Sequence, residues 1–129
     1  MSALETATLY VGLNILILLV LIVLVISQRQ KYKCAIGDGG HKSLMLAIRA
    51  HANAVEVMPM ALIGLLALAS IGAPTLTIHI LGAALTLGRA LHAFGLSNSG
   101  GPSFGRMAGM LLSLFALIGT AIMCLLAAF

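Results

Sequence analysis

Long apolar stretches separated by short polar breaks dominate the chain. Each of four stretches exceeds the roughly 20 residues that a helix needs to cross a bilayer. The stretches cover approximately residues 4–27, 44–71, 75–96 and 105–129. The breaks between them are short, so consecutive spans should pack side by side in opposite directions. The pattern predicts an all-α fold: an integral membrane four-helix antiparallel bundle that forms a single domain over residues 1–129.

The composition supports a membrane protein whose main partner is the lipid bilayer. Of the 129 residues, 61% are hydrophobic and only 8% are charged, whereas a soluble domain has about 25% charged residues. The chain has seven Lys and Arg residues and only three Asp and Glu residues. The basic residues form no run interleaved with aromatics, so the excess of positive charge does not indicate a nucleic-acid partner.

The distribution of basic residues predicts how the bundle is oriented. Residues 28–43 form the one substantial polar loop and hold four of the seven basic residues. Arg106 lies at the second break on the same side of the bundle. Cytoplasmic loops carry an excess of Lys and Arg. Loops 28–43 and 97–106 are therefore expected in the cytoplasm, and both termini outside.

Polar residues inside the apolar spans are the candidate functional groups. Arg49, Asn53 and Glu56 recur at the spacing i, i+4, i+7 in the second span, which places them within about 60° of one another on a helix. In the third span Arg89 and His92 are three residues apart and share a face. A charge at membrane depth costs at least ~2.5–3.5 kcal/mol, so such groups usually face a protein interior or a ligand.

These groups should meet in the cytoplasmic half of the bundle. A rise of 1.5 Å per residue puts Arg49 about 8 Å deep and Arg89 about 10 Å deep from the same surface. Arg106 begins the fourth span nearby, and Glu56 is the one deep acid. A cationic pocket with one carboxylate suits a ligand with two carboxylates and one ammonium. The alternative is a buried ion pair, from Glu56 to either arginine of these spans, that only fixes helix packing.

Small residues indicate how the helices pack. Gly105, Gly109 and Ser113 follow a small-xxx-small pattern, and Ala84 with Gly88 does the same. Such patterns let two helix backbones approach closely. The sequence leaves open whether this contact lies within one subunit or between subunits.

The polar residues resemble the membrane-associated proteins in eicosanoid and glutathione metabolism (MAPEG). The motif Arg-x-x-x-Asn-x-x-Glu, followed by a proline, is matched by Arg49, Asn53, Glu56 and Pro59. The second mark is Gly-Arg followed by His, here at residues 88–92. Four spans in about 130 residues also fit this family. The stretch over residues 35–49 is similar to a small bacterial inner-membrane branch.

The resemblance implies a homotrimer that binds glutathione, as co-substrate, between adjacent subunits, with no metal. The residues that would bind glutathione are Arg49, Asn53, Glu56, Arg89 and His92. Arg106 is similar to the arginine that stabilises the glutathione thiolate, which makes it the expected catalytic residue. A cation lowers the pKa of a nearby thiol, which is about 8.5 when free, and so raises the thiolate fraction at neutral pH.

The function implied is a membrane-bound glutathione-dependent transferase or peroxidase that acts on lipophilic electrophiles or lipid hydroperoxides, in the bacterial inner membrane. One alternative is a noncatalytic lipid- or glutathione-binding member. Leu96 stands where catalytic relatives often carry a tyrosine, and Met107 where some carry a serine. A small four-helix transporter is the weaker alternative, because such transporters generally use a carboxylate in their first helix and few intramembrane cations.

Overall fold

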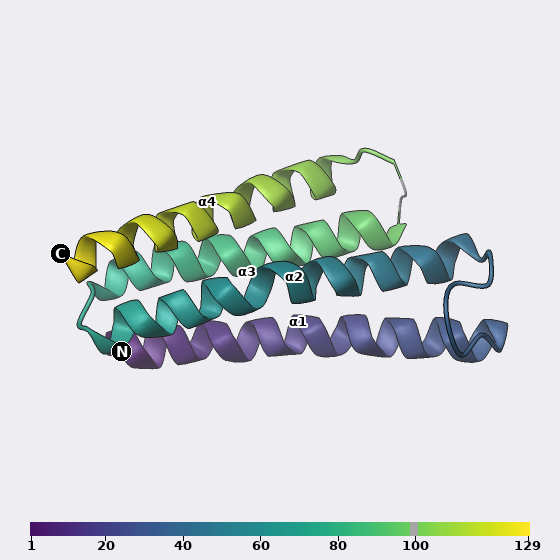
Figure 1. The fold of residues 1–129 in the computed structure, drawn as a ribbon, viewed down its shortest axis with the longest axis horizontal. Coiled ribbons are helices and arrows are strands. Elements are labelled where there is room, and N and C mark those ends of the chain that lie inside the picture. The colour runs from purple at the N-terminus through teal and green to yellow at the C-terminus, as the bar shows by residue number, and fades with distance from the viewer. Residues whose placement is uncertain (99–100) are drawn as a thin grey trace.

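Four long helices make up the computed structural model, which describes residues 1–98 and 101–129 (Figure 1). The helices are α1 (Ala3–Tyr32), α2 (Lys42–Ser70), α3 (Thr75–Asn98) and α4 (Phe104–Ala128). Each of them is long and apolar enough to cross a membrane. The predicted all-α membrane architecture is therefore confirmed. Of the predicted loop 97–106, residues 99 and 100 lie outside the described part of the chain.

The helices run antiparallel, as the short breaks predicted. Both termini and the turn between α2 and α3 lie at one end of the bundle, and the two longer connections lie at the other (Figure 1). Helices α2 and α3 are the inner pair, since each packs against the other three helices, whereas no contact between α1 and α4 is found among the described residues. The basic loop and the start of α4 thus share one end of the bundle. That this end is cytoplasmic stays a prediction.

Helix α1 is longer than the sequence indicated. It begins with a capping box, in which the Ser2 hydroxyl accepts from the Glu5 N–H and the Glu5 carboxylate accepts from the Ser2 N–H. At the other end it continues through Tyr32, so the expectation that residues 28–32 belong to a loop is wrong. The guanidinium of Arg29 donates to carbonyls of the following loop and so holds that loop against the end of the helix.

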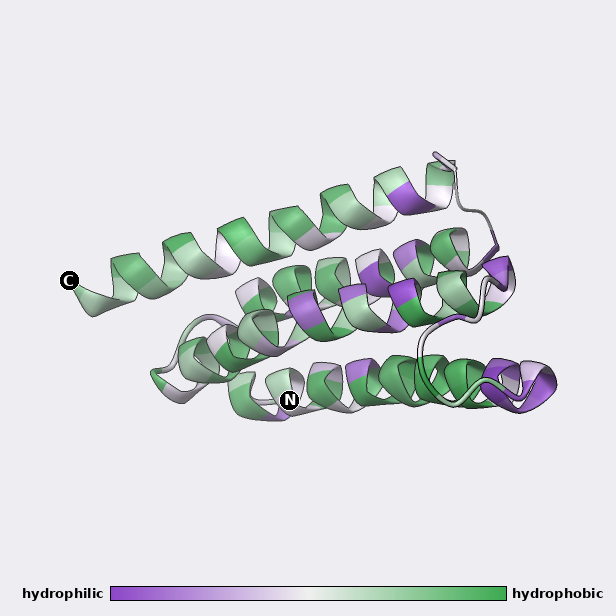
Figure 2. Cartoon of the chain, turned by 45° about the vertical axis from the view of Figure 1, so that its right-hand side comes forward, coloured by the Kyte–Doolittle hydropathy of each residue, from purple (hydrophilic) through white to green (hydrophobic). Residues whose placement is uncertain are grey.

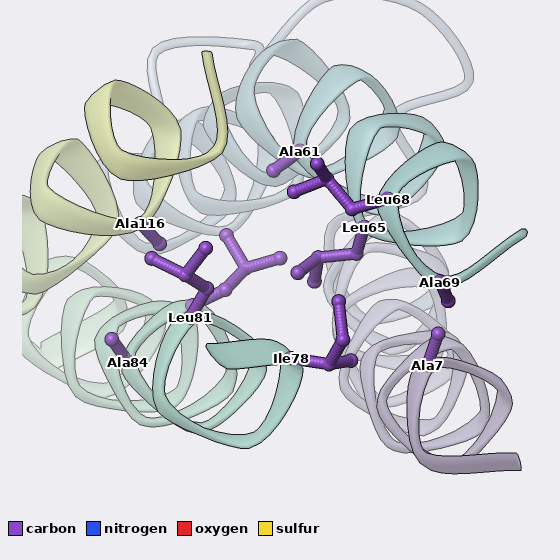
Figure 3. Close-up of a cluster of buried hydrophobic side chains, with 10 residues drawn as sticks. Ala7, Ala61, Leu65, Leu68, Ala69, Ile78, Leu81, Ala84 and Ala116 are labelled. Atoms are coloured by element: carbon purple, nitrogen blue, oxygen red, sulfur yellow. The ribbon is translucent and has the colours of Figure 1, made fainter. Parts of the chain in front are cut away.

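Two apolar clusters form the interior. The larger one gathers alanines and branched side chains from all four helices nearer the termini (Figure 3). It comprises Ala7, Ala61, Leu65, Leu68, Ala69, Ile78, Leu81, Ala84, Leu85 and Ala116. The smaller cluster comprises Leu21, Leu46, Ala50, Ala54, Met58 and Leu96. Many other Leu, Ile, Val and Phe side chains remain exposed on the outer faces, as a surface in contact with lipid requires.

Hydrophilic residues interrupt this apolar surface in few places. Figure 2 shows them at the loop end of α1 and along the loop half of the inner helices. Nearer the termini, polar side chains join α1 to α3: Tyr10 Oη and His79 Nδ1 lie 3.0 Å apart, and Asn14 Nδ2 donates to Thr86 Oγ1 over 2.8 Å. These pairs satisfy several polar groups within the protein, as the absence of water in a bilayer core demands, although Asn14 Oδ1 has no partner among the described residues.

Glycines bring α3 and α4 into backbone contact. A Cβ added at Gly88 would lie 2.6 Å from Ser113 Oγ and 2.8 Å from the carbonyl oxygen of Gly109. A Cβ added at Gly109 would overlap the backbone of His92. The small residues therefore form a helix contact within one subunit. The sequence alone had left open whether this contact lies within or between subunits.

This contact predicts that Gly109→Ala destabilises the protein by about 1–3 kcal/mol, because the new methyl group must push the backbones of α3 and α4 apart. Gly12→Ala is the matched control, since a Cβ at Gly12 meets nothing within 4 Å; it should be neutral or slightly stabilising, as alanine favours a helix. Unfolding of both variants in the same detergent measures the difference. Equal stability of the two variants would contradict the α3–α4 contact.

Candidate functional site

The buried side chain of Arg89 connects three helices. Only 2% of this residue is exposed. Its Nη1 donates to Asn53 Oδ1 of α2 over 2.7 Å, and its Nε donates to Ser113 Oγ of α4 over 2.8 Å. The Ser113 hydroxyl donates in turn to the carbonyl of Gly109 over 2.7 Å. Arg89 therefore fixes the positions of α2 and α4 relative to α3 with neutral partners.

One nitrogen of Arg89 is not satisfied by these contacts. Within residues 1–98 and 101–129, its Nη2 is buried and has no hydrogen-bond partner. An unpaired buried donor is costly, and more so when it carries charge. The guanidinium thus has one unpaired donor, and no carboxylate among the described residues balances its charge.

A pocket opens beside Asn53 in the loop half of the bundle. It has a volume of about 250 Å³ and is formed by α2, α3 and α4. Its lining residues are Met45, Leu46, Arg49, Asn53, His92, Leu96, Arg106 and Met110. We call this the polar pocket. Two arginines, an asparagine and a histidine make it suitable for an anionic ligand.

A second pocket adjoins the polar pocket along α4. It has a volume of about 310 Å³, and its lining residues are His92, Pro102, Arg106, Met107 and Met110. Because His92, Arg106 and Met110 line both pockets, these three side chains form the boundary between them. The side of the second pocket away from that boundary is apolar. We call it the methionine pocket.

The start of α4 positions Arg106. Ser103 caps the helix, and its hydroxyl accepts from the backbone N–H of Arg106 over 3.3 Å. The Arg106 guanidinium donates through Nη1 to the carbonyl of Gly101 over 2.9 Å. The half-buried side chain is thereby held at the mouth of both pockets rather than extended into solvent.

The sequence-predicted residues are brought together except for Glu56. Four of them line the polar pocket directly, and Arg89 lies behind it, bonded to Asn53. Glu56 is exposed on α2 and does not line this pocket. Among the described residues, Glu56 forms no ion pair with Arg49 or Arg89. The ion-pair alternative is therefore wrong for the single chain.

Arg49 and Glu56 instead give α2 a charged outward face. Both side chains are exposed, and Glu56 lies about 21 Å along the helix from its first residue at 1.5 Å per residue. That depth is within the hydrocarbon of a bilayer about 30 Å thick. Charges there almost always face a protein interior or an aqueous cavity, so this face of α2 requires a cover.

Ser113 is the contact of Arg89 that the sequence did not identify. The spacing Gly105, Gly109, Ser113 indicated only a small residue at a helix contact. In the structure its hydroxyl is fully buried and accepts from the guanidinium of Arg89. The available signal was weak: a serine in an apolar helix that packs against a helix carrying a buried arginine.

Comparison with known proteins gives a consistent family. A family model described as the MAPEG family matches residues 7–126. The inner membrane protein YecN of Escherichia coli strain K12 is 40% identical over 92 residues, which cover 71% of this chain and 70% of that protein. The YecN protein of E. coli O6:H1 strain CFT073 shows the same identity and coverage. No solved structure matches the chain.

The Arg89 contacts predict that Ser113→Ala lowers the free energy of unfolding by about 1–3 kcal/mol, because Nε of a buried guanidinium loses its acceptor. Thr120→Val is a matched control on the same helix, since the Thr120 hydroxyl is buried and has no partner among the described residues. Removing an unpaired hydroxyl while keeping the shape should be neutral or stabilising. Thermal unfolding in one detergent compares the two, and a Ser113→Ala variant no less stable than Thr120→Val would refute the assignment.

Proposed function

Because the chain belongs to the MAPEG family, we propose that it is a glutathione-dependent transferase or peroxidase of the bacterial inner membrane. Its substrates would be lipophilic electrophiles or lipid hydroperoxides. The observation that carries the proposal is the polar pocket, where two arginines and Asn53 meet beside a buried guanidinium that has a spare donor. The name of the E. coli relatives supports the inner membrane as the location.

The polar pocket has the chemistry to hold the two carboxylates of glutathione. Arg49 and Arg106 are cations that can form charge-assisted hydrogen bonds with them. Arg89 acts as a positioning residue, because its bond to Oδ1 orients the Asn53 amide. Its unpaired Nη2 strengthens the positive potential of the site. The ammonium group of glutathione would pair with the carboxylate of Glu56.

The charged face of α2 supports an oligomer with the ligand between subunits, and we propose that this oligomer is the homotrimer that the family resemblance implies. Each of the two outward charges would cost at least ~2.5–3.5 kcal/mol in contact with lipid. A second copy of the chain packed over Arg49 and Glu56 removes this cost and also brings Glu56 into a shared pocket wall. In this arrangement one copy contributes the polar pocket and the next copy closes it, so the site is incomplete in the single chain.

The boundary between the two pockets suggests where the chemical step occurs. A thiol held against the Arg106 guanidinium loses its proton to solvent and remains as a thiolate stabilised by the positive charge. The sulfur can then attack an electrophile in the apolar methionine pocket, with a new S–C bond formed as the leaving group departs. With a hydroperoxide, the sulfur attacks the outer peroxide oxygen, and an S–O bond forms as the O–O bond breaks. The alkoxide takes a proton from solvent and leaves as an alcohol. The glutathione sulfenic acid then reacts with a second glutathione to give the disulfide and water.

A noncatalytic glutathione or lipid binder is the second candidate. Leu96 lines the polar pocket, and Met107 lines the methionine pocket, so neither supplies the hydroxyl that a tyrosine or serine would provide there. Binding depends on the arginines and Asn53, whereas turnover depends on the thiolate. The two candidates therefore differ at one measurable point, the ionisation of bound glutathione.

We expect saturating glutathione to give thiolate absorbance near 240 nm with the purified protein in detergent, and Arg106→Ala to lower it about tenfold at neutral pH. A loss of one pKa unit of thiolate stabilisation, about 1.4 kcal/mol, is enough for that change. Lys31→Ala is the control, because it removes an exposed cation that lines neither pocket. Binding without thiolate in the unmodified protein would establish the noncatalytic candidate, and no binding at millimolar glutathione would exclude both.

The role of Glu56 predicts a ligand-selective effect. Glu56→Gln should weaken glutathione binding about thirtyfold, equivalent to about 2 kcal/mol, because the ammonium loses its counter-charge. An analogue of glutathione without the amino group should bind the variant and the unmodified protein with similar affinity. Isothermal titration of both ligands in detergent provides the comparison. Equal weakening for the two ligands would show that Glu56 acts on folding or assembly instead.

A further inference from the structure

An apolar groove runs between α1 and α3, on a different side of α3 from the polar pocket. It has a volume of about 320 Å³. Its lining residues are Ile17, Val20, Leu21 and Leu24 of α1 and Ala90, Ala93, Phe94, Ser97 and Asn98 of α3. The small side chains of Ala90 and Ala93 leave the space that the larger residues of α1 border. The groove is open on one side rather than enclosed by the chain.

The groove leads into a cationic pocket at the loop end of the bundle. This headgroup pocket, as we call it, has a volume of about 540 Å³. Its lining residues are Tyr32, Gly40, His41, Lys42, Ser43, Leu46, Ser97 and Asn98. Ser97 and Asn98 line both spaces, so the apolar groove and the headgroup pocket meet at the end of α3.

Contacts among its own residues hold the wall of the headgroup pocket in place. The rings of Tyr32 and His41 stack with centroids 4.0 Å apart and planes within 9°. Tyr32 Oη and Ser43 Oγ share a hydrogen bond of 2.9 Å. The Nζ of Lys31 lies 5.2 Å from the centre of the Tyr32 ring. The end of α1 and the start of α2 thus present hydroxyl, imidazole and ammonium groups in a fixed arrangement.

The charge around this pocket is positive. Four basic residues and one acidic residue, Asp38, lie between positions 29 and 42. The Asp38 carboxylate accepts from the N–H of Gly40, and the Arg29 guanidinium is bonded to loop carbonyls. Lys42, which lines the headgroup pocket, is therefore its main positive charge, and an anion of the membrane surface is the complementary ligand.

We propose that the apolar groove and the headgroup pocket together bind one anionic glycerophospholipid. Its phosphate and glycerol would lie against Lys42, Ser43 and Tyr32, and an acyl chain would follow the groove toward Ile17. The distance along α1 from Ile17 to Tyr32 is about 22 Å at 1.5 Å per residue. This matches one leaflet, since a bilayer with its headgroup regions is about 40–45 Å thick. The proposal does not depend on glutathione as the ligand of the polar pocket.

The test is native mass spectrometry of the full-length protein in detergent, titrated with phosphatidylglycerol or with phosphatidylethanolamine of the same acyl chains. Phosphatidylglycerol should be retained preferentially. Lys42→Gln should weaken its binding about fivefold, the effect of one lysine near an anionic surface. Lys33→Gln is the matched control, because it removes the same charge from a residue that does not line the pocket, and it should have little effect.

A second pair of variants tests the groove itself. Ala90→Phe fills the groove from an exposed position on α3 and should reduce retention of both lipids, whereas Ala121→Phe adds the same ring to the exposed surface of α4 and should not. Ala90→Leu is the milder variant if the larger ring disturbs folding.

Equal retention of the two lipids, equal effects of the two lysine variants, or unchanged retention in both Ala90 variants would overturn the proposal. So would dissociation of the oligomer by Ala90→Phe with the lipid still bound, since a second copy would then occupy the groove.

Discussion

The buried guanidinium of Arg89 is the interaction on which the arrangement of the inner helices depends. A charge in a bilayer must be solvated by the protein, and here an amide oxygen of α2 and a hydroxyl of α4 supply that solvation. Both partners are neutral, so the positive charge is not cancelled. The same contacts that fix α2 and α4 on α3 therefore leave a positive potential beside the polar pocket. The packing of the inner helices and the proposed anion binding would thus have the same physical cause.

The contact between Arg89 and Ser113 is possible only because α3 and α4 lie so close together. Glycines at positions 88 and 109 let the two backbones meet, and any Cβ there would occupy the space of the partner helix. Between α1 and α3 the opposite holds near the loops, where alanines of α3 face larger side chains of α1 across an open groove. Glycines thus allow α3 to pack closely against α4, whereas alanines of α3 leave an open groove toward α1.

The spans and the polar residues within them could be predicted from the sequence, because bilayer thickness and helical periodicity act on each helix separately. The end of α1 could not. It depends on Lys33 in the left-handed conformation (φ 51°) and on the reach of Arg29 to carbonyls five to eight residues away. Glu56 was placed with Asn53 by their shared helix face. Only the packing of α3 and α4 decides which part of that face is enclosed.

The two open surfaces of the chain differ in what can cover them. On α2 the outward charges of Arg49 and Glu56 exclude acyl chains, because hydrocarbon offers neither hydrogen bonds nor counter-charges. The groove between α1 and α3 is apolar and meets the headgroup pocket at the loop end of the bundle. An anionic lipid would therefore match the groove with an acyl chain and the pocket with its headgroup. Protein on the first surface and lipid on the second is the arrangement that leaves no charge in hydrocarbon. The buried Arg89 is solvated within one chain, whereas the exposed charges of α2 are not, which is why the proposed assembly is needed at that face and not at Arg89.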